Sequence, residues 1–127
     1  MVLTKIQTEV VRQPDQRLRR AWYHNVSSDV VLIHDAESGT MISFEIEWEG
    51  RGGHRAYVVW GRAVGVRSGR IDTGDCGGAL HYKASPVVIW DFRLRPDRVL
   101  EARRLVERSG IEEGLRESVL RRLDERP

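Results

Sequence analysis

The stretch that decides the fold is DVVLIHDAESGTMISFEIEW, residues 29–48. In its second half, apolar and polar residues alternate with the two-residue period of a strand that is buried on one side. The apolar set is Ile42, Phe44, Ile46 and Trp48, and the polar set is Ser43, Glu45 and Glu47. Residues 30–33 form an unbroken, largely β-branched run, which is typical of a more deeply covered strand. Residues 35–39 have turn composition, and Gly39 can adopt the positive φ of a short hairpin. The stretch therefore predicts a central β-hairpin.

Length and composition favour one domain spanning residues 1–127. A chain of this length can bury about two thirds of its unfolded surface without help from disulfides or metals. Its 21 basic and 19 acidic residues leave a net charge of only +2. The single cysteine, Cys76, excludes an internal disulfide and fits a reducing compartment. Neither a signal peptide nor a membrane-spanning apolar run is found, so we expect a cytoplasmic protein of bacterial type with no membrane partner.

Further strands are predicted on both sides of the hairpin. Weak alternation over residues 2–12 predicts an edge strand, which would allow a homodimer to form by strand pairing. Trp22-Tyr23 and residues 55–60 are predicted to enter the sheet. Gly61 and Gly65 indicate bends or bulges. Ser68-Gly69 predicts a turn, residues 70–73 a short strand, and residues 86–90 a last buried strand.

After Pro96 the apolar period becomes helical. Pro96 and Asp97 suit a first turn, and Gly110 predicts a left-handed cap at the end of that helix. The two apolar stripes are Val99, Ala102, Leu105 and Val106, then Ile111, Leu115, Val119, Leu120 and Leu123. We therefore expect an α+β fold: a curled, mostly antiparallel β-sheet or partial barrel over about residues 2–93. A C-terminal α-helical hairpin over about residues 96–125 would pack on the face that carries Phe44.

Polar and aromatic residues gather on the other side of the predicted sheet. They favour a small non-enzymatic binding or interaction module whose ligand is a small molecule or a protein. The candidate ligand-binding residues are Arg20, Trp22, His34, Glu45, Glu47 and Tyr57. The plainer interpretation of the glutamates is a solvated strand face with salt bridges. A weaker hypothesis is a small enzyme in which His34 and Glu45 transfer a proton.

One alternative is catalytic. Residues 74–78, Gly-Asp-Cys-Gly-Gly, resemble the nucleophile loop of chymotrypsin-fold cysteine proteases, in which a histidine activates the thiol. A cysteine-dependent hydrolase would use Cys76 with His34 or His24, and Asp35. The chain before Cys76 is too short for two six-stranded barrels, so a glycine-rich turn is the favoured interpretation.

Other site classes are disfavoured by spacing. The histidines His24, His34, His54 and His81 stand alone and there is one cysteine, so neither a metal nor another cofactor is expected. Residues 50–54 are glycine-rich but lack the Lys-Ser/Thr of a nucleotide-binding loop. Arginine and glutamate are interleaved in the last thirty residues, which argues against a nucleic-acid partner.

The chain also resembles a group of short bacterial proteins of unknown function. The resemblance lies in Arg19-Arg20, Trp22-Tyr23, residues 29–33, residues 42–45 and residues 83–88. It spans most of residues 17–125 and does not include the loop around Cys76. The group implies no activity, so no functional residue is carried over from it.

Overall fold

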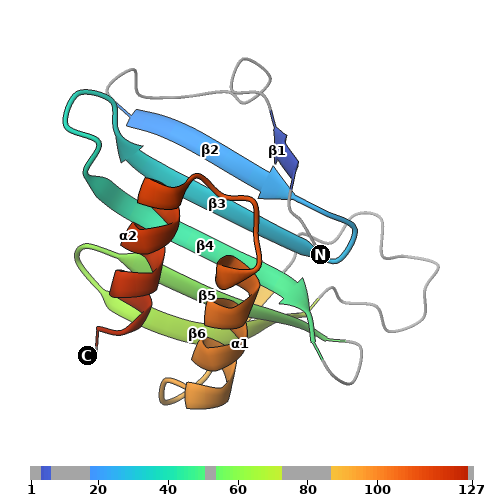
Figure 1. Ribbon diagram of the computed structural model, residues 1–127. Coiled ribbons are helices and arrows are strands. Elements are labelled where there is room, and N and C mark those ends of the chain that lie inside the picture. Colours follow the sequence, from blue (N-terminus) through green and yellow to red (C-terminus); the bar gives the residue numbers. More distant parts are fainter. Residues whose placement is uncertain (1–3, 7–17, 51–53, 73–86, 126–127) are drawn as a thin grey trace.

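An antiparallel meander forms the body of the molecule (Figure 1). The computed structural model describes residues 4–6, 18–50, 54–72 and 87–125. The strands are β1 (Thr4–Ile6), β2 (Leu18–His24), β3 (Ser28–Asp35), β4 (Met41–Glu49), β5 (Arg55–Gly61), β6 (Gly65–Asp72) and β7 (Val87–Trp90). Each strand pairs with its sequence neighbours, so the order across the sheet is β1 to β7. The two outermost of these strands do not pair with each other, so the sheet is open and not a closed barrel.

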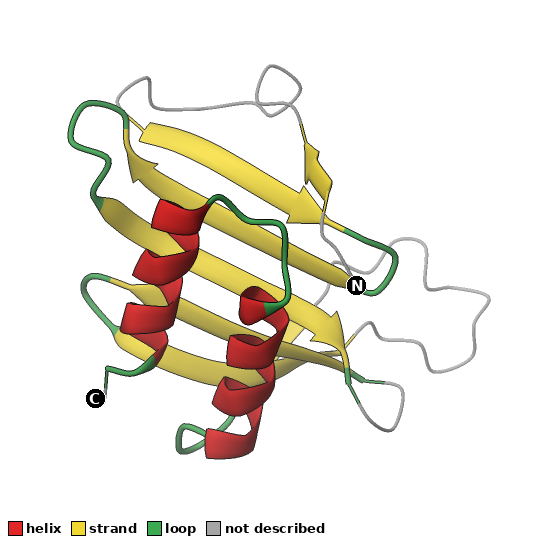
Figure 2. Ribbon diagram, viewed as in Figure 1, coloured by secondary structure: helices red, strands yellow, loops and turns green. Residues whose placement is uncertain are grey.

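Two helices, α1 (Pro96–Glu107) and α2 (Glu113–Leu123), lie side by side on one face of the sheet (Figure 2). The core lies between them and the sheet, where the Phe44 and Trp60 rings stack with centroids 5.8 Å apart. Val106 and Val119 bring the apolar stripes of the two helices into this core and are fully buried. The predicted α+β fold, with its helical hairpin on the Phe44 face, is confirmed.

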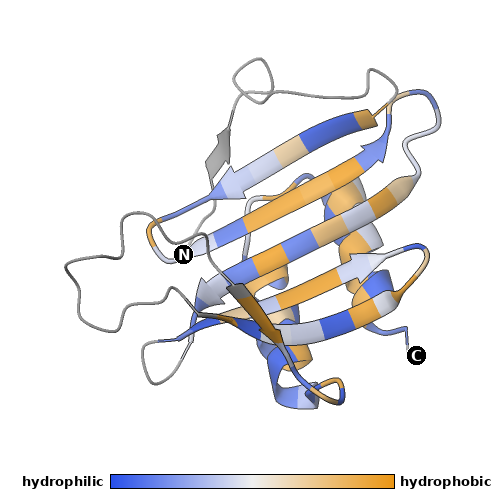
Figure 3. Cartoon of the chain, turned by 180° about the vertical axis from the view of Figure 1, so that it is seen from behind, coloured by the Kyte–Doolittle hydropathy of each residue, from blue (hydrophilic) through white to orange (hydrophobic). Residues whose placement is uncertain are grey.

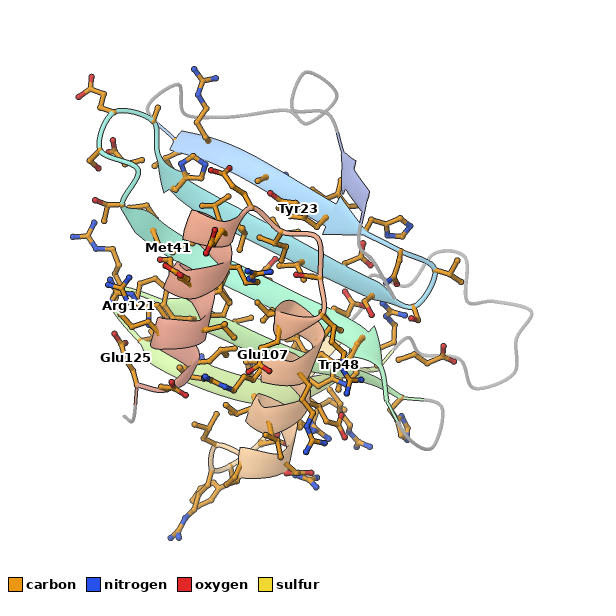
Figure 4. The ribbon with its side chains drawn as sticks, in the orientation of Figure 1. Tyr23, Met41, Trp48, Glu107, Arg121 and Glu125 are labelled. Atoms are coloured by element: carbon orange, nitrogen blue, oxygen red, sulfur yellow. The ribbon has the colours of Figure 1, made fainter. Side chains whose placement is uncertain are left out.

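Two tryptophans of the sheet are hydrogen-bonded to the helical region. Trp48 Nε1 donates to Glu101 Oε2 in α1 at 2.9 Å, and Trp60 Nε1 donates to Glu125 Oε2 beyond α2 at 3.1 Å. The Arg122 guanidinium also lies over the Trp60 ring, 4.8 Å from its centroid. Trp48 and Glu125 are labelled in Figure 4. These bonds satisfy the indole N–H groups of two buried rings and fix the helices in register on the sheet.

The central hairpin is confirmed, with one difference. Asp35 Oδ1 accepts the N–H groups of Glu37 and Ser38, and Gly39 takes the predicted positive φ of 74°. However, the pairing register shifts between Ile33 and His34, which leaves Ile42 as an extra residue in β4. At this bulge Met41 is buried and Ile42 only half-buried, so the expectation that Ile42 lies in the core is wrong.

Ser68-Gly69 is not a turn, because both residues lie within β6. Gly69 lets the backbones of β6 and β7 approach closely, because a Cβ at this position would lie 2.8 Å from the carbonyl oxygen of Ile89 in β7. β7 was expected to be buried, but Ile89 and Trp90 are 37% and 38% exposed because β7 is an edge of the sheet. Gly65, with φ 71°, closes the β5–β6 turn and is not a bulge inside a strand.

The end of α1 also differs from the expectation. The described glycines with positive φ are Gly39 and Gly65, so Gly110 is not a left-handed cap. Instead, the buried Ser109 closes the helix: its Oγ donates to the Val106 carbonyl at 2.6 Å, and its backbone N–H donates to the same oxygen at 3.1 Å. A serine hydroxyl thus satisfies an end carbonyl that a glycine turn was expected to satisfy.

Candidate functional site

The side of the sheet turned away from α1 and α2 carries most of the candidate residues. Figure 3 shows this side from behind, with both helices beyond the sheet. Side chains alternate along each strand, so residues between the buried core positions point to this side. We call it the open face and define it by the following residues of β2 to β7: Arg20, Trp22, His24, Asp29, Val31, Ile33, Glu45, Glu47, Arg55, Tyr57, Val59, Arg67 and Trp90.

Strand register places five of these side chains in one line across the sheet. His24 pairs with Asp29, Asp29 with Glu47, and Glu47 with Tyr57. Tyr57 then pairs with Gly69, and Gly69 with Trp90. Because Gly69 has no side chain, the rings of Tyr57 and Trp90 approach across it, with centroids 5.7 Å apart. We call His24, Asp29, Glu47, Tyr57 and Trp90 the cross-strand row.

Asp29 is the hub at one end of this row. Its Oδ1 accepts a hydrogen bond from Trp22 Nε1 at 2.9 Å and lies 2.7 Å from His24 Nδ1. Its Oδ2 lies 3.5 Å from Arg55 Nη2, and Arg55 Nε donates in turn to Glu47 Oε1. The arginine therefore bridges two half-exposed carboxylates. Such a network holds its side chains in fixed positions, with the carboxylate lone pairs already engaged.

Tyr57 and Trp90 form the other end of the row. The Tyr57 hydroxyl donates to Glu45 Oε1 at 2.6 Å. Burial of the phenol and this bond to a carboxylate raise the pKa of Tyr57 above its ordinary value, so the hydroxyl remains a donor at neutral pH. The Arg67 guanidinium lies 4.1 Å from the centroid of the Trp90 ring, so one face of this exposed indole is covered by a cation.

A half-buried apolar strip lies beside the cross-strand row. Val31 and Val59 pair with Glu45 from its two sides, and Ile33 follows Val31 along β3. The exposed Glu45 lies between Val31 and Val59, so half-buried β-branched side chains are interspersed with charged and aromatic ones on the open face. We call Val31, Ile33 and Val59 the apolar strip.

The structure divides the predicted residue set. Trp22, Glu45, Glu47 and Tyr57 lie together on the open face. His34 does not, because it follows Val30 and Leu32 at two-residue spacing and therefore points to the helix side. His34 and Glu45 lie on opposite sides of the sheet, so the hypothesis that they transfer a proton together is wrong.

Arg20 lies at the border of the sheet. β1 pairs only with residues 22–24 of β2, so no described strand pairs with the outer edge of β2 at Arg20. Arg20 alternates with the buried Ala21 and pairs with Ile33, so its side chain points to the open face. All of the predicted set except His34 therefore lies on the open face.

The hydrolase hypothesis paired His34 with Asp35, and the structure does not bring these two side chains together. Cys76 lies outside the described residues. Asp35 follows His34 directly in β3, so their side chains point to opposite sides of the strand, and Asp35 Oδ1 holds the hairpin turn. His34 Nδ1 lies 3.3 Å from the backbone carbonyl of Asp35. The imidazole–carboxylate pair seen here is instead His24 with Asp29.

Five polar or aromatic residues of the open face were missed from the sequence: His24 as a ligand-binding residue, Asp29, Arg55, Arg67 and Trp90. His24 and Asp29 flank the β2–β3 turn, so a hairpin register over residues 24–29 would have paired them. Arg55, Arg67 and Trp90 join the face through β5, β6 and β7, and their placement needs the whole meander.

Within the described parts of the chain, no group of three or more His, Cys, Asp or Glu side chains is arranged to hold a metal ion. Neither described helix has the length and apolar composition needed to cross a membrane. Comparison with known proteins finds no matching family model, curated protein or solved structure.

Proposed function

We propose that the protein is a non-enzymatic binding module whose open face docks one other folded protein. The observation that supports this most directly is the cross-strand row beside its apolar strip. The row combines donors, carboxylates and two aromatic rings, and its members are already held by one another. Side chains that are ordered before binding lose less entropy when a partner arrives.

The size of the open face favours a protein over a small molecule as the partner. The six strands β2 to β7, spaced about 4.8 Å apart, span about 24 Å, and seven residues of a strand span about 23 Å. The product, roughly 550 Å², is about two thirds of the about 800 Å² that each partner buries in a standard protein–protein interface. A small ligand would instead require a concave site on this face.

Site-specific photo-cross-linking in cells of the source organism tests the proposal. A benzophenone amino acid is placed at position 45 on the open face and, as a matched control, at position 117 on the exposed side of α2. Both positions carry exposed glutamates, so the two substitutions are comparable. We expect one protein to be captured from position 45 and not from position 117.

Binding of the captured protein is then measured by isothermal titration calorimetry. Val59→Arg places a charge in the apolar strip and should weaken binding at least about tenfold, as a central interface residue does. Glu117→Arg should leave binding unchanged. Equal capture from both positions, capture of nothing but a second copy of the chain, or unchanged binding by Val59→Arg would contradict the proposal.

A second candidate function, the cysteine-dependent hydrolase, is supported by one observation. His24 Nδ1 is paired with Asp29, and no described residue bonds to its Nε2. A hydrolase would lower the pKa of the Cys76 thiol below about 8.5. The rate of iodoacetamide alkylation against pH, in the parent and in His24→Ala, tests this. A low midpoint that rises in the variant would support the hydrolase, and an ordinary midpoint shared by both proteins would exclude it.

A further inference from the structure

A cleft of about 320 Å³ lies on the helix side of the sheet, between the β2–β3 turn and the second half of α1. Ser28 at the start of β3 pairs across the strands with Trp48 near the end of β4, and both line the cleft. Figure 4 labels Trp48 beside α1. We call it the Ser28 cleft and define it by Asn25, Ser28, Trp48 and Leu105. None of these residues belongs to the open face.

Ser28 differs from the other buried serines that the structure describes, Ser68 and Ser109. The Ser68 hydroxyl donates to Asp91 Oδ2 at 2.7 Å, and that of Ser109 donates to a backbone carbonyl at 2.6 Å. Ser28 is 5% exposed, yet no described group forms a hydrogen bond with its Oγ. Buried hydroxyl groups in proteins almost always have a partner. The Ser28 hydroxyl is therefore available to a molecule that enters the cleft.

The apolar walls of the Ser28 cleft are held in place by the fold. Trp48 is 7% exposed, and its indole is fixed by the hydrogen bond from Nε1 to Glu101 Oε2 at 2.9 Å. Leu105 is half-buried and packs against the hydrophobic core. A ligand in the cleft would therefore meet apolar surface from Trp48 and Leu105, with the Ser28 hydroxyl close by.

The charges around the Ser28 cleft do not call for a charged ligand. Arg104 and Arg108 line it but are exposed, so water screens them, and the carboxylate of Glu101 opposes them. Asn25 adds a neutral amide at the β2–β3 turn. Its Oδ1 accepts the backbone N–H of Ser27 at 2.9 Å, while its amide N–H groups have no acceptor among the described residues. These groups fit a neutral ligand with one or two hydrogen-bonding atoms.

We propose that the Ser28 cleft binds a small neutral aromatic compound that carries a hydroxyl or amide group. Its ring would lie against Trp48 and Leu105, because an aromatic ring gains from contact with an indole as well as from burial. Its polar group would bond to the Ser28 hydroxyl, which can both donate and accept. A volume of about 320 Å³ is at the lower end for sites that hold small molecules, so the ligand is compact. This inference does not depend on the proposed function of the open face.

The test is a titration of the full chain by NMR with three uncharged probes. Phenol has the ring and the hydroxyl, toluene has the ring alone, and cyclohexanol has the hydroxyl without an aromatic ring. We expect phenol to shift the amide signals of Ser28 and Leu105 and the indole N–H signal of Trp48, with saturation. Phenol should bind at least about threefold more tightly than cyclohexanol, which lacks the aromatic contact with the indole.

The variant Ser28→Ala removes the hydroxyl and leaves the apolar walls in place. It should weaken phenol binding about fivefold, which is the contribution of one neutral hydrogen bond, and should change toluene binding by less than about twofold. Ser118→Ala, the matched control, removes a serine hydroxyl from α2 and should leave phenol binding unchanged. Because Ser28 Oγ has no described partner, Ser28→Ala should also keep the urea midpoint of the parent protein.

Saturable shifts found only outside the Ser28 cleft, or none with any probe, would overturn the proposal. Unchanged phenol binding by Ser28→Ala, or equal weakening of phenol and toluene, would show that the hydroxyl does not bond to the ligand. Equal affinity for phenol and cyclohexanol would overturn the assignment to an aromatic compound. A urea midpoint of Ser28→Ala as low as that of Ser109→Ala would show that Ser28 has a partner within the protein, which would remove the basis of the inference.

Discussion

The variant Gly69→Ala tests the pairing of β6 and β7 and the alignment of the cross-strand row. The new methyl carbon would lie 2.8 Å from the carbonyl oxygen of Ile89 and 3.3 Å from the Cα of Trp90. Both atoms belong to the backbone of β7, so a change of rotamer cannot relieve the contact. Either β7 shifts as a unit, or it separates from β6.

The expected loss of stability can be estimated in two ways. Forcing an extra carbon into a close contact costs about 1–3 kcal/mol. Releasing β7 instead removes a ladder of four residue pairs, in which each hydrogen bond contributes about 1 kcal/mol net. The first route is the less costly of the two, so the expected loss is roughly 2 kcal/mol. For a chain of 127 residues this corresponds to a fall in Tm of about 6–10 °C.

Urea denaturation followed by tryptophan fluorescence measures the loss, with Gly114→Ala as the matched control. At Gly114 the same added carbon meets nothing, and alanine favours a helix, so stability should stay unchanged or rise by about 0.5–1 kcal/mol. NMR of Gly69→Ala should show shifts concentrated in residues 88–90 and at Tyr57. If Gly69→Ala is as stable as the parent, residues 68–69 do not lie in a strand paired with β7 and the reasoning fails.

Three further substitutions test the core, a helix end and the open face. Tyr57→Phe should reduce the loss of stability that the parent protein shows above about pH 10. The pKa of the Tyr57 phenol is raised on folding, so the phenol stabilises the fold below its unfolded pKa, and this contribution is lost as the pH rises toward the folded pKa. An equal loss of stability at alkaline pH in both proteins, measured by urea midpoints, would contradict the bond to Glu45. Ser109→Ala removes the bond to the Val106 carbonyl and should cost about 1 kcal/mol in urea denaturation, with an unchanged m-value; no loss would mean that this bond does not stabilise the end of α1. Val119→Ala should cost roughly 2–3 kcal/mol by the same assay because its side chain is fully buried; a variant as stable as the parent would show that α2 does not pack on the sheet.

Local features made the hairpin and the helices predictable. The alternation before Trp48, the turn chemistry ending at Gly39 and the first-turn residues Pro96 and Asp97 each act over a few residues. The side on which His34 lies was also available, since its spacing from Val30 and Leu32 places it with the core. His34 was assigned to the ligand-binding residues of the other face because its chemical type was considered before its position in the strand.

Features that depend on a neighbouring strand were not predictable from local sequence. Gly69 has the composition of a turn, yet its role is to admit the backbone of β7 and to let two rings meet. Asp29 looks like an ordinary strand end until the register brings Trp22, His24 and Arg55 to it. The candidate site is largely made of such cross-strand relations, which explains why fewer of its residues than of its strands were found.

The bulge at Ile42 has a consequence for how the chain can change in length. Met41 and Phe44 both belong to the core, yet they are three residues apart. In a regular strand, two side chains on the same face are separated by an even number of residues. Deletion of Ile42 would restore that alternation and keep every later side chain on its present side. Removal of a residue elsewhere in β4 would move the side chains of part of the strand to the opposite face of the sheet. Evolution or engineering can therefore shorten this strand by one residue at that point, while the rest of β4 permits only exchanges of one residue for another.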